Sequence, residues 1–138
     1  MGGDDGLKAF GGQDILHGGA GDDTLNLSLG GSDSATVSGD AGNDLVELWG
    51  AAGSHATIDS GSGNDHIRVD GFVGDLTLTL GDGRDRVELT SSQTTVTRIV
   101  ITDFSAGEDG DGLDLEAFMK ANGAGEAYGV NAVATGGW

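Results

Sequence analysis

A nine-residue pattern returns along this chain at an almost constant period, and no other feature of the sequence limits its fold as strongly. Residues 39–47 read GDAGNDLVE, with glycine at position four, aspartate at position six and an aliphatic residue at position eight. The four clear frames are residues 18–26, 39–47, 60–68 and 80–88, which start 21, 21 and 20 residues apart. Two looser copies precede them at a nine-residue step, with Asp5 and Asp14 at position six. Such a period is typical of a solenoid, in which each repeat forms a coil that stacks on the next.

Each repeat predicts a turn followed by a strand. The glycines allow positive φ, so the chain can turn tightly and direct carbonyl oxygens at a common centre. Aliphatic residues at positions eight and ten, such as Val46 and Leu48, alternate with polar residues and predict a strand with one buried face. The residues between frames predict the return side of each coil. Its inward positions are expected to align as Ala35, Ala56, Leu76 and Thr97, and as Val37, Ile58, Leu78 and Ile99.

The aspartates at position six are expected to form a column, because equivalent residues of stacked coils lie about 4.8 Å apart. Two carboxylates at that distance repel each other by about 0.9 kcal/mol in water and by about 3.5 kcal/mol at an effective dielectric constant of 20. A calcium ion would relieve this repulsion, because it accepts carboxylate and carbonyl oxygens in flexible geometry, whereas magnesium requires a near-ideal octahedron. One such glycine-rich segment would be an ordinary turn. Four copies in register favour metal binding instead. The column comprises Asp5, Asp23, Asp44, Asp65 and Asp85.

In these motifs the chain resembles the repeat-in-toxin (RTX) family of calcium-binding proteins, over residues 2–115. The resemblance implies a right-handed parallel β-roll or β-helix. It also implies that the carbonyls of positions one to four and the aspartate of position six hold calcium between adjacent coils, with about three to five ions in all. The opposite edge of the roll would hold metal at most near Asp14, with Asp33 as a candidate for its neighbour. The expected ligand-bearing residues are Asp5, Asp14, Gly18, Gly19, Ala20, Gly21, Asp23, Gly39, Asp40, Ala41, Gly42, Asp44, Ser60, Gly61, Ser62, Gly63, Asp65, Leu80, Gly81, Asp82, Gly83 and Asp85.

Composition agrees with a solenoid that needs its metal. The 138 residues include 28 glycines and no proline or cysteine, and aromatic residues make up only 5%, so a thin core of stacked aliphatic side chains is expected. The net charge of −17 argues against nucleic acid or an anionic membrane as a partner. High acidity with few aromatic residues is typical of disorder. We therefore expect a chain that is unfolded when calcium is scarce and folds when calcium neutralises the aspartates.

The C-terminal part is expected to close the stack. We divide the chain into a roll, residues 1–93, and a capping segment, residues 94–138, within one structural domain. Residues 101–115 resemble the capping unit of the family, and Asp114 is a candidate N-cap for a short helix. Its apolar face would be Leu115, Phe118 and Met119, and it would end at Asn122 and Gly123. The chain is expected to be a piece of a longer protein.

The functional prediction is structural rather than catalytic. The sequence has no cysteine, no Gly-x-Ser-x-Gly and no His-Glu-x-x-His, so we expect no enzyme activity. No signal peptide and no apolar run long enough to span a bilayer are recognisable. The resemblance implies type I export from a Gram-negative bacterium, folding outside the cell and stabilisation of neighbouring domains. Two alternatives stay open: an adhesion or polysaccharide-binding module that uses Arg68, Arg84 and Arg86 on a cell-surface glycan, and the C-terminal secretion tail of a secreted hydrolase.

Overall fold

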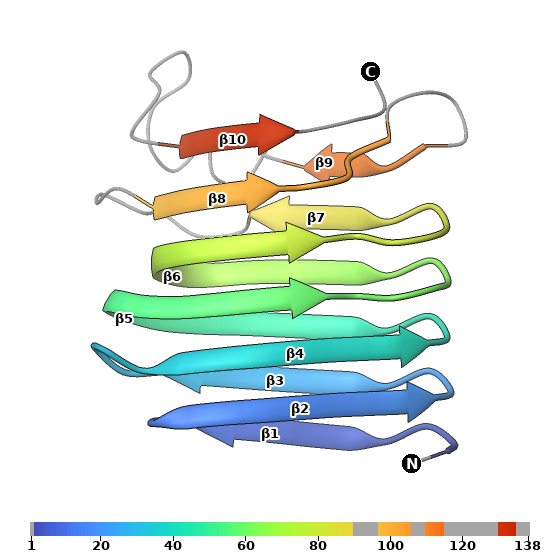
Figure 1. Cartoon of the computed structure of the whole chain (residues 1–138), viewed down its shortest axis with the longest axis horizontal. Helices are drawn as coiled ribbons and strands as arrows, with labels where there is room; N and C mark the ends of the chain where they lie inside the picture. The colour runs from blue at the N-terminus through green and yellow to red at the C-terminus, as the bar shows by residue number, and fades with distance from the viewer. Residues whose placement is uncertain (1, 90–96, 106–109, 115–129, 135–138) are drawn as a thin grey trace.

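The computed structural model describes residues 2–89, 97–105, 110–114 and 130–134, and it is built from parallel β-strands (Figure 1). The strands are β1 (Gly6–Phe10), β2 (Gln13–Ala20), β3 (Thr24–Leu29), β4 (Ser34–Ala41), β5 (Leu45–Asp59), β6 (His66–Thr79), β7 (Arg86–Leu89), β8 (Thr97–Ile101), β9 (Gly112–Asp114) and β10 (Val130–Ala134). Every pairing between them is parallel. The prediction of an all-β parallel solenoid is thus confirmed, with about four turns.

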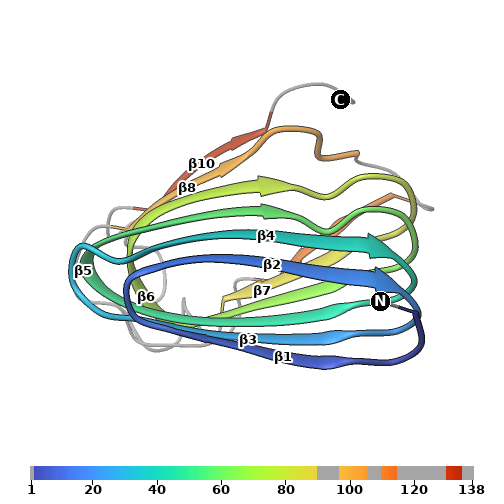
Figure 2. The ribbon, with the colours of Figure 1, turned by 60° about the horizontal axis from the view of Figure 1, so that its bottom comes forward.

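The coils are flattened, so the strands form two layers. One layer follows the order β1-β3-β5-β6-β7-β9, and the other runs through β2, β4, β5, β6, β8 and β10. Figure 2 shows the layers from the end of the stack, with β1 and β3 on one side and β2 and β4 on the other. β5 and β6 belong to both layers because each continues round one edge of the coil. At the other edge lie the turns that carry the aspartates.

Alternating aliphatic side chains fill the space between the layers. In the first layer Leu25 lies opposite Val46, which lies opposite Ile67 and then Val87, and none of the four is exposed. The return layer contributes Val37, Ile58, Leu78 and Ile101 in the same way. The period of two in these strands therefore forms one continuous core, in which each coil buries the inner face of its neighbours.

One predicted register is wrong. Counting by the 21-residue period placed Thr97 beside Leu76 and Ile99 beside Leu78, but Ile99 pairs with Leu76 and Ile101 with Leu78. The step from β6 to β8 is therefore 23 residues, because the chain between β7 and β8 is longer than the earlier connections. A slip of two residues keeps the same side chains inside, so the alternation survives although the partners change.

The predicted capping helix is not confirmed. The described part of the chain contains no helix. Asp114, the expected N-cap, is the last residue of β9, and residues 115–129 lie outside the described residues. β8 pairs with β6 and β9 pairs with β7, so the start of the segment assigned to capping continues the sheet of the roll. Among the described residues no helix is long and apolar enough to cross a bilayer.

Candidate metal centre

The aspartates at position six form a buried column at one edge of the solenoid. Asp23, Asp44, Asp65 and Asp85 each follow a glycine-containing turn and directly precede a strand. Only 1 to 2% of each residue is exposed. Asp5, in the first coil, is half-buried. The structure therefore brings the predicted carboxylates together, in the order that the period implies.

From Asp23 onward, one oxygen of each carboxylate links adjacent coils. The backbone N–H of Asp23 donates a hydrogen bond to Oδ1 of Asp44 at 2.8 Å, and Asp44 donates in the same way to Asp65 at 2.8 Å. Asp5 donates to Asp23 at 2.7 Å and Asp65 to Asp85 at 2.8 Å. Each aspartate thus satisfies a buried N–H of the preceding coil, so the column also stabilises the fold itself.

The other oxygen has no partner. Oδ2 is buried without a hydrogen bond in Asp5, Asp14, Asp23, Asp44, Asp65 and Asp85. A buried polar atom left unsatisfied costs about 1 to 3 kcal/mol, and more when the group is charged. Native proteins contain few such atoms, and a cation bound at the site is one physical reason for their presence. Five of these six atoms belong to the aspartate column.

Burial has a direct effect on protonation. It raises the pKa of Asp65 and of Asp85 from 3.8 to about 6, although a backbone N–H donor on each group acts in the opposite direction. Burial also raises the pKa of Asp44. Neighbouring aspartates in the column add to each shift by repulsion. Without a cation, the column therefore holds its negative charge only at an energetic cost.

Backbone carbonyls lie beside the unpartnered oxygens. A Cβ atom added to Gly39 would lie 2.4 Å from Oδ2 of Asp44 and 2.3 Å from the carbonyl oxygen of Ser60. A Cβ at Gly18 would lie 2.4 Å from Oδ2 of Asp23 and 2.7 Å from the carbonyl oxygen of Gly39. A carboxylate and a carbonyl from successive coils thus face the same small space. Oxygen donors of these two kinds fit calcium.

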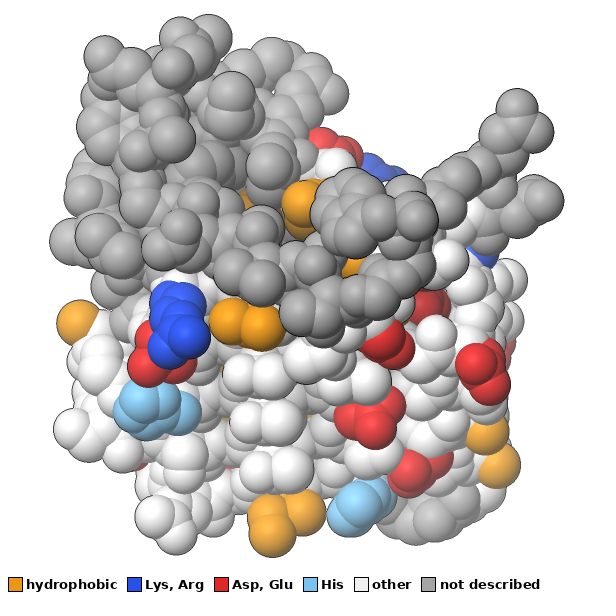
Figure 3. Space-filling view, turned by 45° about the horizontal axis from the view of Figure 1, so that its top comes forward, with side chains coloured by type: hydrophobic (Ala, Val, Ile, Leu, Met, Phe, Trp, Pro, Cys, Tyr) orange, Lys and Arg blue, Asp and Glu red, His pale blue; other side chains and the backbone are white. Residues whose placement is uncertain are grey.

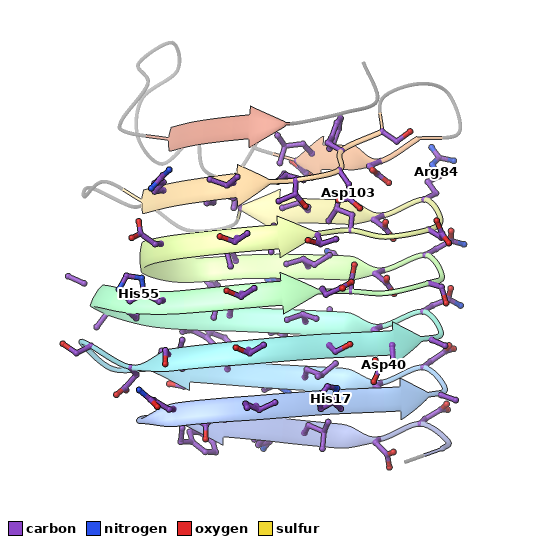
Figure 4. The ribbon with its side chains drawn as sticks, in the orientation of Figure 1. His17, Asp40, His55, Arg84 and Asp103 are labelled. Atoms are coloured by element: carbon purple, nitrogen blue, oxygen red, sulfur yellow. The ribbon has the colours of Figure 1, made fainter. Side chains whose placement is uncertain are left out.

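The carbonyls of positions two and three form hydrogen bonds between coils. Asp40 accepts a bond from Ser62 N–H at 2.9 Å, and Ala41 accepts one from Gly21 N–H at 2.9 Å. Ser62 and Asp82 accept equivalent bonds from Gly42 and Gly63. A carbonyl has two lone pairs, so these bonds leave room for a second interaction. The side chains of Asp40 (Figure 4) and Asp82 are exposed, so within the column these residues offer only their backbone.

Asp14 lies apart from the column. It is in β2, in the return layer, where its register partner is Ala35. The next coil therefore offers no second carboxylate at this position. Asp33 instead accepts a hydrogen bond from Gly30 N–H in its own turn, at 2.6 Å.

Among the described residues, no three Asp, Glu, His or Cys side chains converge as a metal site made of side chains alone. Any cation held here must therefore rely on backbone carbonyls.

Two features of the column were not predicted. A second file runs along position five, where Asn43 N–H donates to Oδ1 of Asp22 at 2.8 Å and Asn64 N–H donates to Oδ1 of Asn43 at 2.8 Å. The recurrence of Asp or Asn at this position was the available signal. The column also extends to Asp111, whose Oδ1 accepts a bond from Asp85 N–H at 3.0 Å. Its signal was an aspartate two residues before Leu113, as in the clear frames.

Asp111 differs from the other members because both of its oxygens are satisfied. Its Oδ2 accepts a hydrogen bond from Ser105 N–H at 2.8 Å. Asp103 lies above the turn that follows β6 (Figure 4), where it accepts bonds from Leu80 N–H at 2.7 Å and Gly81 N–H at 2.8 Å. At this end of the stack, backbone N–H groups therefore donate hydrogen bonds to both oxygens of Asp103 and of Asp111.

Acidic side chains also gather on the surface near this edge. In Figure 3 most of them lie toward the right of the molecule, the side on which Figure 1 shows the aspartate-bearing turns. The arginines do not form a free cationic patch. Arg86 forms an ion pair with Asp114 at 2.8 Å, and Arg68 lies 3.9 Å from Glu47. Arg84 lies at the outer side of its turn (Figure 4).

The raised pKa values predict an unusual pH dependence for the metal-free chain. In chelator, the folded fraction should rise when the pH is lowered from about 7.5 to about 5. The folded-state pKa of Asp65 and Asp85, about 6, exceeds the ordinary 3.8, so the folded state binds more protons between these values. Between pH 7.5 and 5 this gain is on the order of 1 kcal/mol per group. The full contribution, about 3 kcal/mol per group, is present below the unfolded pKa and is lost as the pH rises through about 6.

Far-UV circular dichroism against pH in chelator would measure this effect. Replacing both residues, as Asp65→Asn with Asp85→Asn, should remove most of the dependence. An unchanged pH profile in the double variant would show that other groups are responsible.

Comparison with family models, with curated proteins and with solved structures finds no match to this chain.

Proposed function

We propose that this chain is a calcium-binding module that folds when calcium occupies the aspartate column, and that its role is structural. One observation carries the proposal: four carboxylate oxygens in line, those of Asp23, Asp44, Asp65 and Asp85, are buried without a hydrogen bond. They lie at the turns of a repeat whose neighbouring coils present carbonyl oxygens to the same space at Gly18 and Gly39. These are the ligands of a hard cation rather than of a soft one.

The energetic argument connects the metal to folding. Stacking the coils brings like charges together and takes them out of water, and both effects oppose the folded state. The unfolded chain does not preform the sites, so the free energy of binding becomes free energy of folding. At a calcium concentration one hundred times the dissociation constant, each occupied site stabilises the fold by about 2.7 kcal/mol. The binding free energy of a few such sites would therefore equal the whole free energy of unfolding of an ordinary small domain.

The cellular setting follows from this coupling, together with the RTX-like motif. A chain that is unfolded at low calcium and folds at high calcium suits secretion through a narrow channel, with type I export from a Gram-negative bacterium as the route. Outside the cell, or at its surface, the folded roll would stabilise neighbouring domains of a larger protein. As the tail of a secreted hydrolase, it would act in the same structural way.

The alternative role, binding of a polysaccharide, is less well supported when that polysaccharide is acidic. It required Arg68, Arg84 and Arg86 to act together, but Arg68 lies beside Glu47 and Arg86 pairs with Asp114. With a net charge of −17, the surface would repel an anionic glycan.

A calcium titration would test the proposed function. Starting in chelator at pH 7.5, calcium should produce a cooperative gain of β signal in far-UV circular dichroism. Magnesium at the same concentration should produce little, because it binds poorly to flexible sites of backbone carbonyls. A full β signal in chelator that calcium does not change would refute the proposal, because the fold would then not need the metal.

A further inference from the structure

The first residue of each frame lies against the aspartate column, and its side chain differs from coil to coil. The four residues are Gly18, Gly39, Ser60 and Leu80. All four are buried, and Ser60 and Leu80 have no exposed surface. The coils are therefore equivalent in their aspartates but not in the space next to them.

At Gly18 and Gly39 this space holds no side chain. In both cases the unpartnered Oδ2 of one aspartate and the carbonyl oxygen of the next coil's first residue lie within 2.7 Å of the place where a Cβ would be. Any substituent there would contact two oxygens of different coils, one carrying a negative charge. These positions are open toward a cation.

At Ser60 the corresponding space contains a hydroxymethyl group. Ser60 Oγ donates a hydrogen bond to the carbonyl oxygen of Leu80 at 2.6 Å. Leu80 is the first residue of the next frame, so its carbonyl is the counterpart of those at Gly39 and Ser60. The hydroxyl also lies beside the carboxyl group of Asp65. Its shortest hydrogen bond goes to Leu80, and Oδ2 of Asp65 has no hydrogen-bond partner.

We propose that Ser60 closes the third position of the column to calcium, so that the ions bind beside Gly18 and Gly39 but not beside Ser60. The proposal rests on the proposed function, since it concerns how many ions the column takes. A hydroxymethyl group that already bonds to the Leu80 carbonyl uses one of its two lone pairs and occupies part of the space that a cation needs. Calcium would then hold the coils together toward the N-terminal end of the stack. Toward the other end, hydrogen bonds to the carboxylates of Asp103 and Asp111 would do so.

Counting calcium ions by native mass spectrometry, with isothermal titration calorimetry as a second measure, would test this proposal. The whole chain should be compared with Ser60→Gly and Ser60→Ala. Ser60→Gly should bind one calcium more than the unchanged chain, because it recreates the open position of Gly39. Ser60→Ala should bind the same number as the unchanged chain, because its Cβ still occupies the space.

The reciprocal variant Gly39→Ser should bind one ion fewer. It also covers the case in which Ser60→Gly does not fold. Circular dichroism in saturating calcium would show for both variants whether they fold, since a Cβ at Gly39 would lie 2.3 Å from the Ser60 carbonyl oxygen. An unchanged count in Ser60→Gly, or in Gly39→Ser, would overturn the proposal. A lower count in Ser60→Gly would also overturn it, by making the hydroxyl a ligand. If the unchanged chain binds no calcium at all, the proposed function fails; if it binds calcium but the counts do not move, only the role of Ser60 fails.

Discussion

Replacing Gly63 with alanine should destabilise the folded module by more than about 3 kcal/mol in saturating calcium. Gly63 has a φ of +135°, and a Cβ there would lie 1.8 Å from the carbonyl oxygen of Gly42 in the preceding coil. That contact involves backbone on both sides, so no side chain can move to relieve it. Separating these two coils would weaken the bond from Gly42 N–H to the Ser62 carbonyl, now 2.9 Å. The strained φ and the steric overlap are both recognised causes of large destabilisation.

Gly12→Ala is the matched control, because it separates the two causes. Gly12 also has a positive φ, +85°, but nothing lies within 4 Å of its added Cβ. This variant should lose only about 1 kcal/mol, the typical cost of a positive φ for a residue with a Cβ. Urea unfolding of both variants in calcium gives the comparison. Equal losses would mean that the coils can separate at the turns without a penalty, contrary to the close stacking of Gly63 on Gly42.

Asp44→Asn should have opposite effects in calcium and in chelator. In calcium it should lose about 2.7 kcal/mol or more, because it removes a charged ligand from the column. In chelator at pH 7.5 its folded fraction should equal or exceed that of the unchanged chain. The amide can keep an oxygen for the Asp23 N–H while removing a buried charge whose pKa is raised. Unfolding curves in calcium and circular dichroism in chelator would measure the two effects.

Two further variants make this result specific. Asp44→Ala should lose stability in both conditions, because it also leaves the N–H of Asp23 without its acceptor. Asp75→Asn removes the same charge from an exposed position on the return layer and should change stability by less than about 0.5 kcal/mol. If Asp44→Asn were destabilised equally with and without calcium, Asp44 would act only through its hydrogen bond and not through a metal.

Much of the site could be predicted because the repeat is local. Position six follows the turn at a constant offset, and a constant period stacks equal positions, so the column of Asp23, Asp44, Asp65 and Asp85 required no knowledge of distant contacts. The alternation of aliphatic and polar residues around Val46 and Leu48 likewise predicted that these two side chains point into the core. The prediction failed where the period changes: the longer connection before β8 moved Ile99 from Leu78 to Leu76. Asp111 was missed because its frame lacks the glycine at position four.

The sequence by itself determined the parallel stacking, the buried face of each strand and the line of aspartates, because each depends only on a period and on residue type. The tertiary structure decided what each carboxylate oxygen contacts, since a hydrogen bond requires an orientation that no period specifies. It shows that the two oxygens of one carboxylate differ. Oδ1 accepts a hydrogen bond from an N–H of the preceding coil, as in Asp23. Oδ2 has no hydrogen-bond partner in Asp23, whereas in Asp111 it accepts a bond from Ser105 N–H. It also showed that the Ser60 hydroxyl donates to the Leu80 carbonyl, whereas a Cβ at Gly39 would meet Asp44 Oδ2 and the Ser60 carbonyl. Whether a position can hold a metal depends on such contacts between coils, which lie about 20 residues apart in the chain and meet only when it is folded.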